Sequence, residues 1–223
     1  MKVLALDTAL SGCSVALAAS GRITACRRNA EPRGQAENLL GMLEATLREA
    51  AFRYADLDLI AVTIGPGSFS GLRIGLATAR GLALASGRPL RGIGTLEALA
   101  GAVPTVERAG RSVVAAIEAG RGEIYLQSFD AAGTPLAPPR AIARDQAVAA
   151  LPSGPLVVVG SGIGAFGPAL AGPDCIASSA AAAIDAAVVA GLAMARGLPP
   201  AGSPPPAPLY LRPPDARLPD SPR

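Results

Sequence analysis

The stretch GPGSFSGLRIG, residues 65–75, decides how this chain folds. It follows an apolar run, 58–64, that is typical of a buried strand, and it leads into a helical pattern over 72–86 that a glycine ends. Free amides and the dipole at a helix N-terminus favour anions. However, the stretch lacks the lysine of a P-loop, and neither Ser68 nor Ser70 has the flanking glycines of a nucleophile elbow. Its glycines therefore indicate either a ligand contact or tight packing of strand on helix.

The strands and helices expected in the first half of the chain recur in the same order in the second half. Before it, three extended runs precede a helical pattern, and after it a short strand and helix lead into a second set of strands. The pattern predicts an α/β fold of two lobes, each built in the order βββαβα. The expected strands are 2–8, 13–19, 23–28, 58–64, 112–118, 123–130, a weak one near Leu136 and 155–160; the expected helices are 35–51, 72–86, 95–100, 144–151 and 178–196.

The repeat divides the chain into three parts. We expect an N-terminal lobe over 1–102, a C-terminal lobe over 103–198 and a proline-rich tail over 199–223. The prolines predict that the tail is an extended tether. Within it, residues 209–212 are expected to dock back onto the body, and the last ten residues are expected to be loose.

Composition excludes several classes of protein. Half of the 223 residues are apolar, and there is no histidine, which removes histidine-based zinc sites, Ser-His-Asp triads and imidazole bases. The net charge is only +3 and aromatic residues make up 3%, so any contact with RNA is expected to be electrostatic and secondary. Three distant cysteines and the absence of a signal-peptide or membrane-span pattern predict a cytoplasmic protein with no membrane contact.

Two carboxylates end corresponding strands of the two halves. Asp7, followed by Thr8, ends the first strand, and Glu118 ends its counterpart in the second half. Strand ends of α/β sheets present ligand-binding groups, so these side chains are expected to face one cleft between the lobes. Gly160 and Gly162 follow another strand of the second half. Capping residues and plain glycine turns remain the alternative interpretation.

Small residues spaced by four form a ridge along the helix 72–86. Gly71, Gly75 and Ala79 belong to this ridge, and small residues allow close approach of another helix or a sheet. The ridge predicts packing either against a partner protein or within the chain. In the first case, a Gly75→Leu variant is expected to stay folded and to lose its partner.

Together these motifs resemble the TsaB family over essentially the whole chain. The resemblance is carried by the two βββαβα halves, Asp7-Thr8, the stretch 65–75, TLEAL at 95–99, GEIY at 122–125 and YLR at 210–212. It implies the fold of actin, sugar kinases and ribonuclease-H-like ATPases.

The resemblance also implies a function. TsaB proteins are non-catalytic dimerisation subunits that bind TsaD, which transfers a threonylcarbamoyl group to an adenosine beside the anticodon of tRNAs that read ANN codons. TsaC supplies the activated group, and the ATPase TsaE joins the complex. For this chain the family implies a heterodimer with a TsaD relative, a homodimer when alone, and tRNA contact only within the complex.

Individual residues fit a non-catalytic role within that family. Where the catalytic relative has two metal-ligand histidines four residues apart, this chain has Thr95 and Leu99, and neither side chain replaces an imidazole at a metal. Gln35 replaces the usual histidine at the start of the first long helix, and Glu118 replaces an aspartate of the second lobe. An ATPase or a glycoprotease-like enzyme of the same fold is the alternative.

The implied sites are therefore a partner interface and a vestigial nucleotide cleft, with no catalytic residue, no metal and at most weak ATP or ADP binding. The interface is expected at Leu39, Leu40, Leu43, Leu47, Gly71, Leu72, Gly75 and Ala79. The cleft is expected at Asp7, Thr8, Gly65, Gly67, Ser68, Glu118, Gly160 and Gly162.

Overall fold

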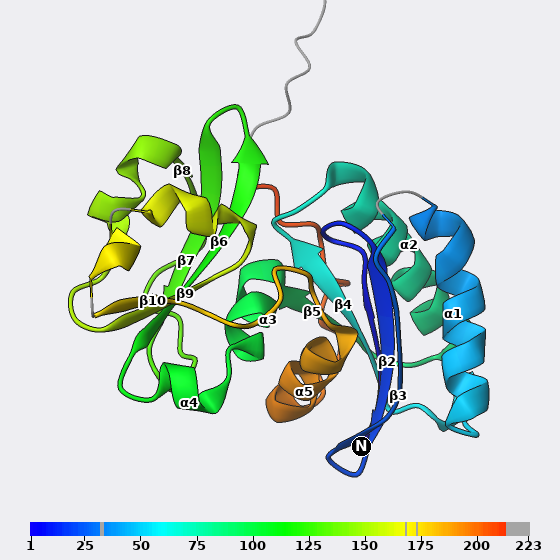
Figure 1. The fold of residues 1–223 in the computed structure, drawn as a ribbon. Coiled ribbons are helices and arrows are strands. Elements are labelled where there is room, and N and C mark those ends of the chain that lie inside the picture. Colours follow the sequence, from blue (N-terminus) through cyan, green and yellow to red (C-terminus); the bar gives the residue numbers. More distant parts are fainter. Residues whose placement is uncertain (32–33, 168, 173, 213–223) are drawn as a thin grey trace, which may run out of the picture.

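Two five-stranded sheets form the framework of the molecule (Figure 1). The structure, a computed structural model, describes residues 1–31, 34–167, 169–172 and 174–212. The first sheet has the order β3-β2-β1-β4-β5, and its strands are β1 (Lys2–Asp7), β2 (Cys13–Ala19), β3 (Arg22–Asn29), β4 (Leu59–Gly65) and β5 (Leu90–Gly94). The second has the order β10-β9-β6-β7-β8, and its strands are β6 (Ser112–Gly120), β7 (Glu123–Phe129), β8 (Arg140–Ala143), β9 (Leu156–Val159) and β10 (Cys175–Ala177).

The two sheets have the same topology. In the first, β1 is antiparallel to β2 and parallel to β4; in the second, β6 is antiparallel to β7 and parallel to β9. Each sheet therefore begins with a hairpin and continues through a crossover, as the repeated order of elements predicts.

Two long helices cover the outer face of the first sheet. They are α1 (Gln35–Glu49) and α2 (Phe69–Ser86), and α2 begins at Ser68, whose hydroxyl accepts a hydrogen bond from the Gly71 amide, and ends at the left-handed Gly87. Large side chains fill this interface, because alternate residues of each strand point to the same face. They include Leu4, Leu6, Leu17, Leu39, Leu43, Ile60 and Leu76.

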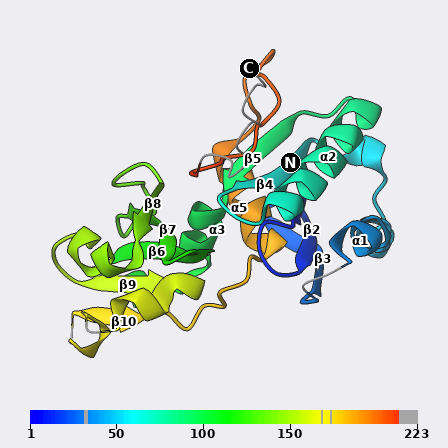
Figure 2. The same cartoon turned by 90° about the horizontal axis from the view of Figure 1, so that it is seen from above.

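Helices α3 (Thr95–Ala102) and α5 (Ala186–Arg196) lie between the two sheets (Figure 2). The inner faces of both sheets and these two helices form one buried cluster, in which many side chains are small. Members from all four elements include Ala5, Ala16, Leu99, Ile117, Val157 and Val189. The two lobes therefore share a continuous core. A short helix, α4 (Thr105–Arg108), links α3 to β6.

Among the described residues, the outer face of the second sheet carries only short 3₁₀ turns. They are η2 (Arg144–Gln146), η3 (Val148–Ala150), η4 (Ser161–Phe166) and η5 (Ala169–Ala171), and one further turn, η1 (Tyr54–Asp56), precedes β4. The helix predicted over 144–151 is thus wrong, since η2 and η3 replace it. Glycines at 160, 162, 164 and 167 disfavour a helix after β9.

Two other predictions are corrected. The third strand of the second half is β8, because near Leu136 there is only an isolated bridge between Phe129 and Pro135. The helix predicted from residue 178 begins at Ala186, where Asp185 caps it, and the strand β10 had no counterpart in the sequence analysis. Its three residues are too few to show a period.

The chain returns to the first lobe at its C-terminal end. Helix α5 packs against β1, β2 and β4, so residues 103–198 do not form a self-contained lobe. The expected docking of 209–212 is confirmed, because the Leu209 amide donates a 2.7 Å hydrogen bond to the Ile64 carbonyl of β4. Residues 213–223, most of them in the segment predicted to be loose, lie outside the described ranges. Within those ranges, no helix is both long and apolar enough to cross a bilayer.

Candidate functional site

The loop between β4 and α2 lies directly against the end of β1. The Ser68 amide donates a 2.7 Å hydrogen bond to the Ala9 carbonyl. A Cβ at Gly67 would overlap that same carbonyl oxygen, and a Cβ at Gly71 would overlap the Thr8 carbonyl oxygen. These glycines are therefore required for close backbone packing, which was the structural alternative for this stretch.

Asp7 is buried beneath this loop. Its side chain is 3% exposed and accepts hydrogen bonds from the Thr63 hydroxyl at 2.7 Å and the Ala9 amide at 3.0 Å. Burial, aided by the negative charge of Asp185, raises the pKa of Asp7 to about 6, although the two hydrogen bonds act in the opposite direction. Thr8 is buried as well and donates to the Gly71 carbonyl at 2.7 Å. Through these hydrogen bonds, Asp7 and Thr8 connect the end of β1 to β4 and α2.

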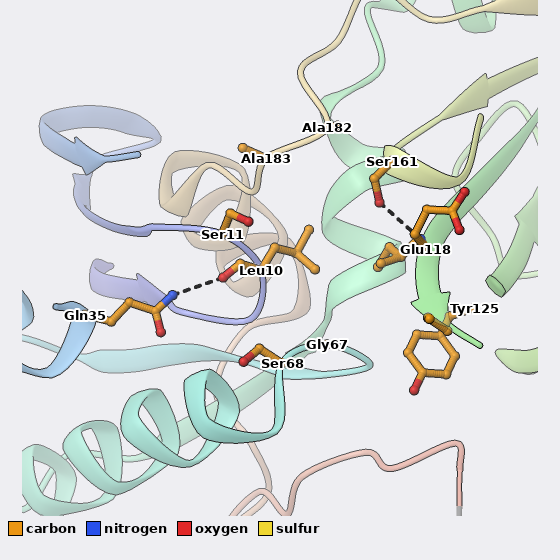
Figure 3. Close-up of a pocket in the computed structure, with 13 residues that line it drawn as sticks. Leu10, Ser11, Gln35, Gly67, Ser68, Glu118, Tyr125, Ser161, Ala182 and Ala183 are labelled. Atoms are coloured by element: carbon orange, nitrogen blue, oxygen red, sulfur yellow. Dashed lines mark hydrogen bonds between the residues drawn. The ribbon is translucent and has the colours of Figure 1, made fainter. Parts of the chain in front are cut away.

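A cavity of about 690 Å³ lies between the lobes (Figure 3). One wall comes from the β1–β2 turn, the start of α1 and the loop before α2; the other comes from β6, β7 and η4. The lining residues are Leu10, Ser11, Gln35, Gly67, Ser68, Ile117, Glu118, Ala119, Gly120, Tyr125, Ser161, Ala182 and Ala183. We call this cavity the cleft.

The structure brings only part of the predicted cleft together. Gly67, Ser68 and Glu118 line it, whereas the other predicted members do not. Asp7 is buried away from it, so the expectation that Asp7 and Glu118 face one cleft is wrong. Gly160 and Gly162 instead allow η4 to pack on Ala116 of β6, where a Cβ at either position would be crowded. Sequence alone cannot show that a loop closes over a carboxylate at a strand end.

The cleft does not fit a magnesium-bound nucleotide. Glu118 is the only carboxylate among the described lining residues, and it pairs with Arg144. The same lining contains no lysine or arginine to contact phosphates. No group of three or more His, Cys, Asp or Glu side chains gathers as a metal site within the described ranges. The residues present therefore do not supply the cation contacts and carboxylates that phosphoryl transfer uses.

The two positions at which the resemblance implied a comparison with metal-ligand histidines are also buried. Thr95 and Leu99 are both 0% exposed, and Leu99 belongs to the core shared by the two lobes. The Thr95 hydroxyl has no hydrogen-bond partner among the described residues. Both positions are therefore occupied by side chains of the packed interior.

The ridge of small residues on α2 faces the inside of the protein. Gly71, Gly75 and Ala79 are buried, and a Cβ at Gly75 would overlap the Thr8 hydroxyl. The expectation that these residues face a partner is corrected, because Thr8, which directly follows β1, already occupies the space against the two glycines. Among the other predicted interface residues, the side chains of Leu39, Leu43, Leu47 and Leu72 are also in the core, and only Leu40, 56% exposed, is on the surface.

The outward faces of α1 and α2 carry a different set of residues, of which the sequence analysis identified only Leu40. On α2 they are Phe69, Arg73, Ala77, Arg80, Gly81 and Leu84; on α1 they are Glu37, Leu40, Gly41, Glu44 and Arg48. Leu84 is 87% exposed and Phe69 is 54% exposed. We call this set the α1–α2 face. Most of its members recur every three or four residues along each helix, so the same helical period could have found it.

Charge is segregated on the α1–α2 face. On this face α1 contributes Glu37, Glu44 and Arg48, whereas α2 contributes Arg73 and Arg80 and no carboxylate. A partner with the opposite arrangement would match it in charge.

Comparison with known proteins adds three findings. The family model of TsaD, tRNA N6-adenosine threonylcarbamoyltransferase, matches residues 31–195. The tRNA threonylcarbamoyladenosine biosynthesis protein TsaB of Escherichia coli is 39% identical over 129 residues, which is 58% of this chain and 55% of that protein. A solved protein of Pseudomonas aeruginosa, described as similar to peptidase YeaZ, superimposes with a TM-score of 0.78 at 30% identity, covering 95% of this chain and 99% of that one.

A more distant structure shows the fold alone. The ethanolamine utilization protein EutJ from Carboxydothermus hydrogenoformans has a TM-score of 0.53 at 13% identity, over 86% of this chain and 90% of its own. The matches to the TsaB proteins of Escherichia coli and Haemophilus influenzae span 55% and 52% of their lengths, so the chain matches about half of each of these curated relatives.

Proposed function

Since this chain belongs to the family that comprises TsaD and TsaB, and within it to the TsaB group, we propose that it is a non-catalytic docking subunit. In this proposal it binds a TsaD relative in the cytoplasm, with a TsaE-type ATPase joining the complex. It is needed for formation of threonylcarbamoyladenosine beside the anticodon of tRNAs that read ANN codons. The names of its relatives support the pathway, and the TsaD model supports the kind of partner.

The single observation that carries docking is the α1–α2 face. Its exposed side chains include Leu40, Phe69 and Leu84, beside the small residues Gly41 and Gly81. Small residues let helices of a partner approach closely, and exposed apolar and aromatic side chains supply anchors. Two outward-facing helices of this kind suit a four-helix contact with the corresponding helices of a TsaD relative.

The same face suits a homodimer when the partner is absent. In a two-fold contact, α1 of one copy lies against α2 of the other. The glutamates of α1 then face Arg73 and Arg80 of the second copy. Such a contact is self-complementary in charge and covers Leu84.

The cleft supports the non-catalytic part of the proposal. Its residues do not fit a magnesium-bound nucleotide, so ATP or ADP binding is expected to be weak. We expect the purified chain alone to show no ATP or peptide hydrolysis. Turnover that depends on Glu118 would favour the enzyme alternative instead.

The test of docking uses one exposed leucine on the α1–α2 face and one away from it. Leu84→Glu is expected to weaken capture of the TsaD relative by about 2 kcal/mol or more, because a carboxylate would enter an apolar contact. Leu136→Glu, at a 52% exposed leucine of the second lobe, is the matched control and is expected to bind normally. Equal binding by both variants, measured by calorimetry, would place the interface elsewhere.

A second measurement tests the pathway. Threonylcarbamoyladenosine formation on tRNA is reconstituted with and without this chain, and Leu84→Glu is expected to reduce it in proportion to lost binding. Tight binding of tRNA by the chain alone at physiological salt would contradict a purely docking role.

A further inference from the structure

We propose that the C-terminal segment 206–212 is a latch that ties α2 to the second lobe and so holds the cleft closed. The latch acts between two segments that are far apart in sequence, the first turns of α2 and the β6–β7 hairpin. In Figure 1 it is the red segment that passes from beside β4 toward β6. Its consequence for partner binding rests on the proposed function, whereas its effect on the cleft does not.

The first end of the latch is held by exposed side chains of α2. The Arg80 guanidinium donates a 2.6 Å hydrogen bond to the Pro206 carbonyl. The Tyr210 ring lies 5.5 Å from the Phe69 ring, and the Arg73 guanidinium lies over Phe69 at 3.8 Å from its centroid. Arg73 also donates to the Tyr210 hydroxyl at 3.4 Å. Aromatic and cation–π contacts of this kind stabilise a fixed arrangement.

Backbone contacts place the middle of the latch on β4. The Leu209 amide donates to the Ile64 carbonyl, and the Leu209 carbonyl approaches Gly65 so closely that a Cβ there would lie 2.6 Å from its oxygen. The segment is therefore packed on the sheet before it reaches the second lobe.

The second end of the latch is an ion pair in the other lobe. The Arg212 guanidinium pairs with the Glu123 carboxylate of β7 and donates to the Gly120 carbonyl of β6 at 3.3 Å. The Arg212 side chain is 23% exposed, so this contact is screened less than a free surface pair. Tyr210 and Arg212 are only two residues apart, and they contact different lobes.

Both ends of the latch adjoin the lining of the cleft. Ser68, next to Phe69, lines the wall of the first lobe, and Gly120, which contacts Arg212, lines the wall of the second. The lobes are joined besides by the core around α3 and α5. Two lobes that share a core at one place and a short tether at another can open only if the tether releases.

Partner docking and latch closure are expected to reinforce each other. The side chains that hold Tyr210, namely Phe69 and Arg73, belong to the α1–α2 face. A partner that packs on them also confines Tyr210, and by linkage a closed latch raises affinity for that partner. The affinity of the α1–α2 face for its partner would in this way depend on whether the cleft is closed.

The first test uses the full chain without a partner. Hydrogen exchange is followed at the amides of 67–68 and 118–120 in the natural chain, in Glu123→Ala and in a chain that ends at Pro208. Exchange is expected to accelerate at both walls in both variants, while the exchange of α1 stays unchanged. The double charge swap Glu123→Arg with Arg212→Glu is expected to restore protection.

The control removes an ion pair that lies within one segment. Asp56→Asn breaks the exposed pair with Arg53 and is expected to leave the cleft amides unchanged. The proposal is wrong if Glu123→Ala and the shortened chain are both folded by circular dichroism and their amides at both walls exchange at the rates of the natural chain.

The second test measures coupling. Glu123 is not on the α1–α2 face, yet Glu123→Ala is expected to lower affinity for the TsaD relative by about fivefold, which is typical of coupled sites. If the natural chain captures no such partner, the proposed function fails while the exchange result still decides the latch. Unchanged affinity in Glu123→Ala would contradict the coupling.

Discussion

The outer layers of the two lobes differ, although their sheets have one topology. Helices α1 and α2, with 15 and 18 residues, cover the first sheet, whereas the second sheet carries 3₁₀ turns of three to six residues. Both layers close a hydrophobic core, around Leu39 and Leu43 in one lobe and around Phe166 in the other. A duplicated sheet therefore requires a covering layer on each outer face, but it does not require helices there.

The difference separates two tasks. Short turns with exposed backbone give no continuous surface for another protein, whereas two long helices present one. The first lobe thus combines a structural layer, facing inward, with the α1–α2 face, facing outward. Substitutions that distinguish inward from outward positions test this division.

The largest effect is expected at the inward face of α2. Gly75→Leu is expected to lower the free energy of unfolding by about 3 kcal/mol, because its side chain would overlap Thr8, which directly follows β1. This outcome reverses the expectation from sequence, in which the variant stays stable and loses its partner. Thermal and urea unfolding measure it, and Gly81→Leu, where nothing lies within 4 Å, is the control. Equal stability of the two variants would mean that the ridge is not packed inside.

The next effect compares two carboxylates, Asp7 at the end of β1 and Glu118 near the end of β6. The pKa of Asp7 is raised to about 6 from the ordinary 3.8. As the pH rises, the Asp7 carboxyl therefore loses its proton in the unfolded chain before it does so in the folded protein. Its contribution to stability is present below about pH 4 and is lost as pH rises through 6.

Asp7→Asn keeps an acceptor for Thr63 and Ala9 without a charge. It is therefore expected to raise the free energy of unfolding at pH 7.5 by about 2 to 3 kcal/mol and to flatten its dependence between pH 4 and 6. Glu118→Gln, which removes an exposed ion pair, is expected to change stability by less than about 1 kcal/mol. A loss of stability in Asp7→Asn across this range would show that the charge itself is needed.

A smaller effect concerns how the covering elements begin. Ser68 caps α2 with its hydroxyl, whereas Gly160, at the same point before η4, provides no side-chain cap. Ser68→Ala is expected to cost about 1 kcal/mol, and Ser68→Asp, which keeps a capping oxygen, is expected to recover most of it. Urea unfolding of the three proteins provides the comparison, and identical midpoints would show that the cap is dispensable.

The smallest effect is expected on the outward face. Gly81→Ala is expected to stabilise the chain by about 0.5 to 1 kcal/mol, because alanine favours a helix and its Cβ meets no neighbour. A loss of stability on thermal unfolding would indicate that α2 is strained at this position.

Much of the fold follows from local pattern. Periodicity and glycine signals identified β1, β2, β4, α1 and α2, because each is long enough to show its period. The strand β10 and the 3₁₀ turns were missed, since three residues carry no period. The start of α5 was misplaced because alanines at 180–183 favour a helix that tertiary contacts do not form there.

The candidate site was harder to predict, for a related reason. A ridge such as Gly71, Gly75 and Ala79 shows that something approaches closely, but a strand and a partner helix favour the same small residues. Likewise the sequence pattern indicates that Asp7 is a ligand-binding group at a strand end, because the pattern does not show that the loop at 67–71 covers this side chain. The latch is revealed by contacts between residues far apart in sequence, such as those of Tyr210 with Phe69 and of Arg212 with Glu123.

The position of α5 has a consequence for synthesis. This helix covers the inner face of the first sheet, yet its residues, 186–196, leave the ribosome well after β5 (Leu90–Gly94), the last strand of that sheet. Until they emerge, the apolar inner face around Val3, Ala5 and Ala16 has no cover from α5, although all strands of that sheet have been made. The first lobe thus completes its burial only after α5 has been made, and an arrested chain that stops before residue 186 is a natural client for chaperones that bind apolar surface.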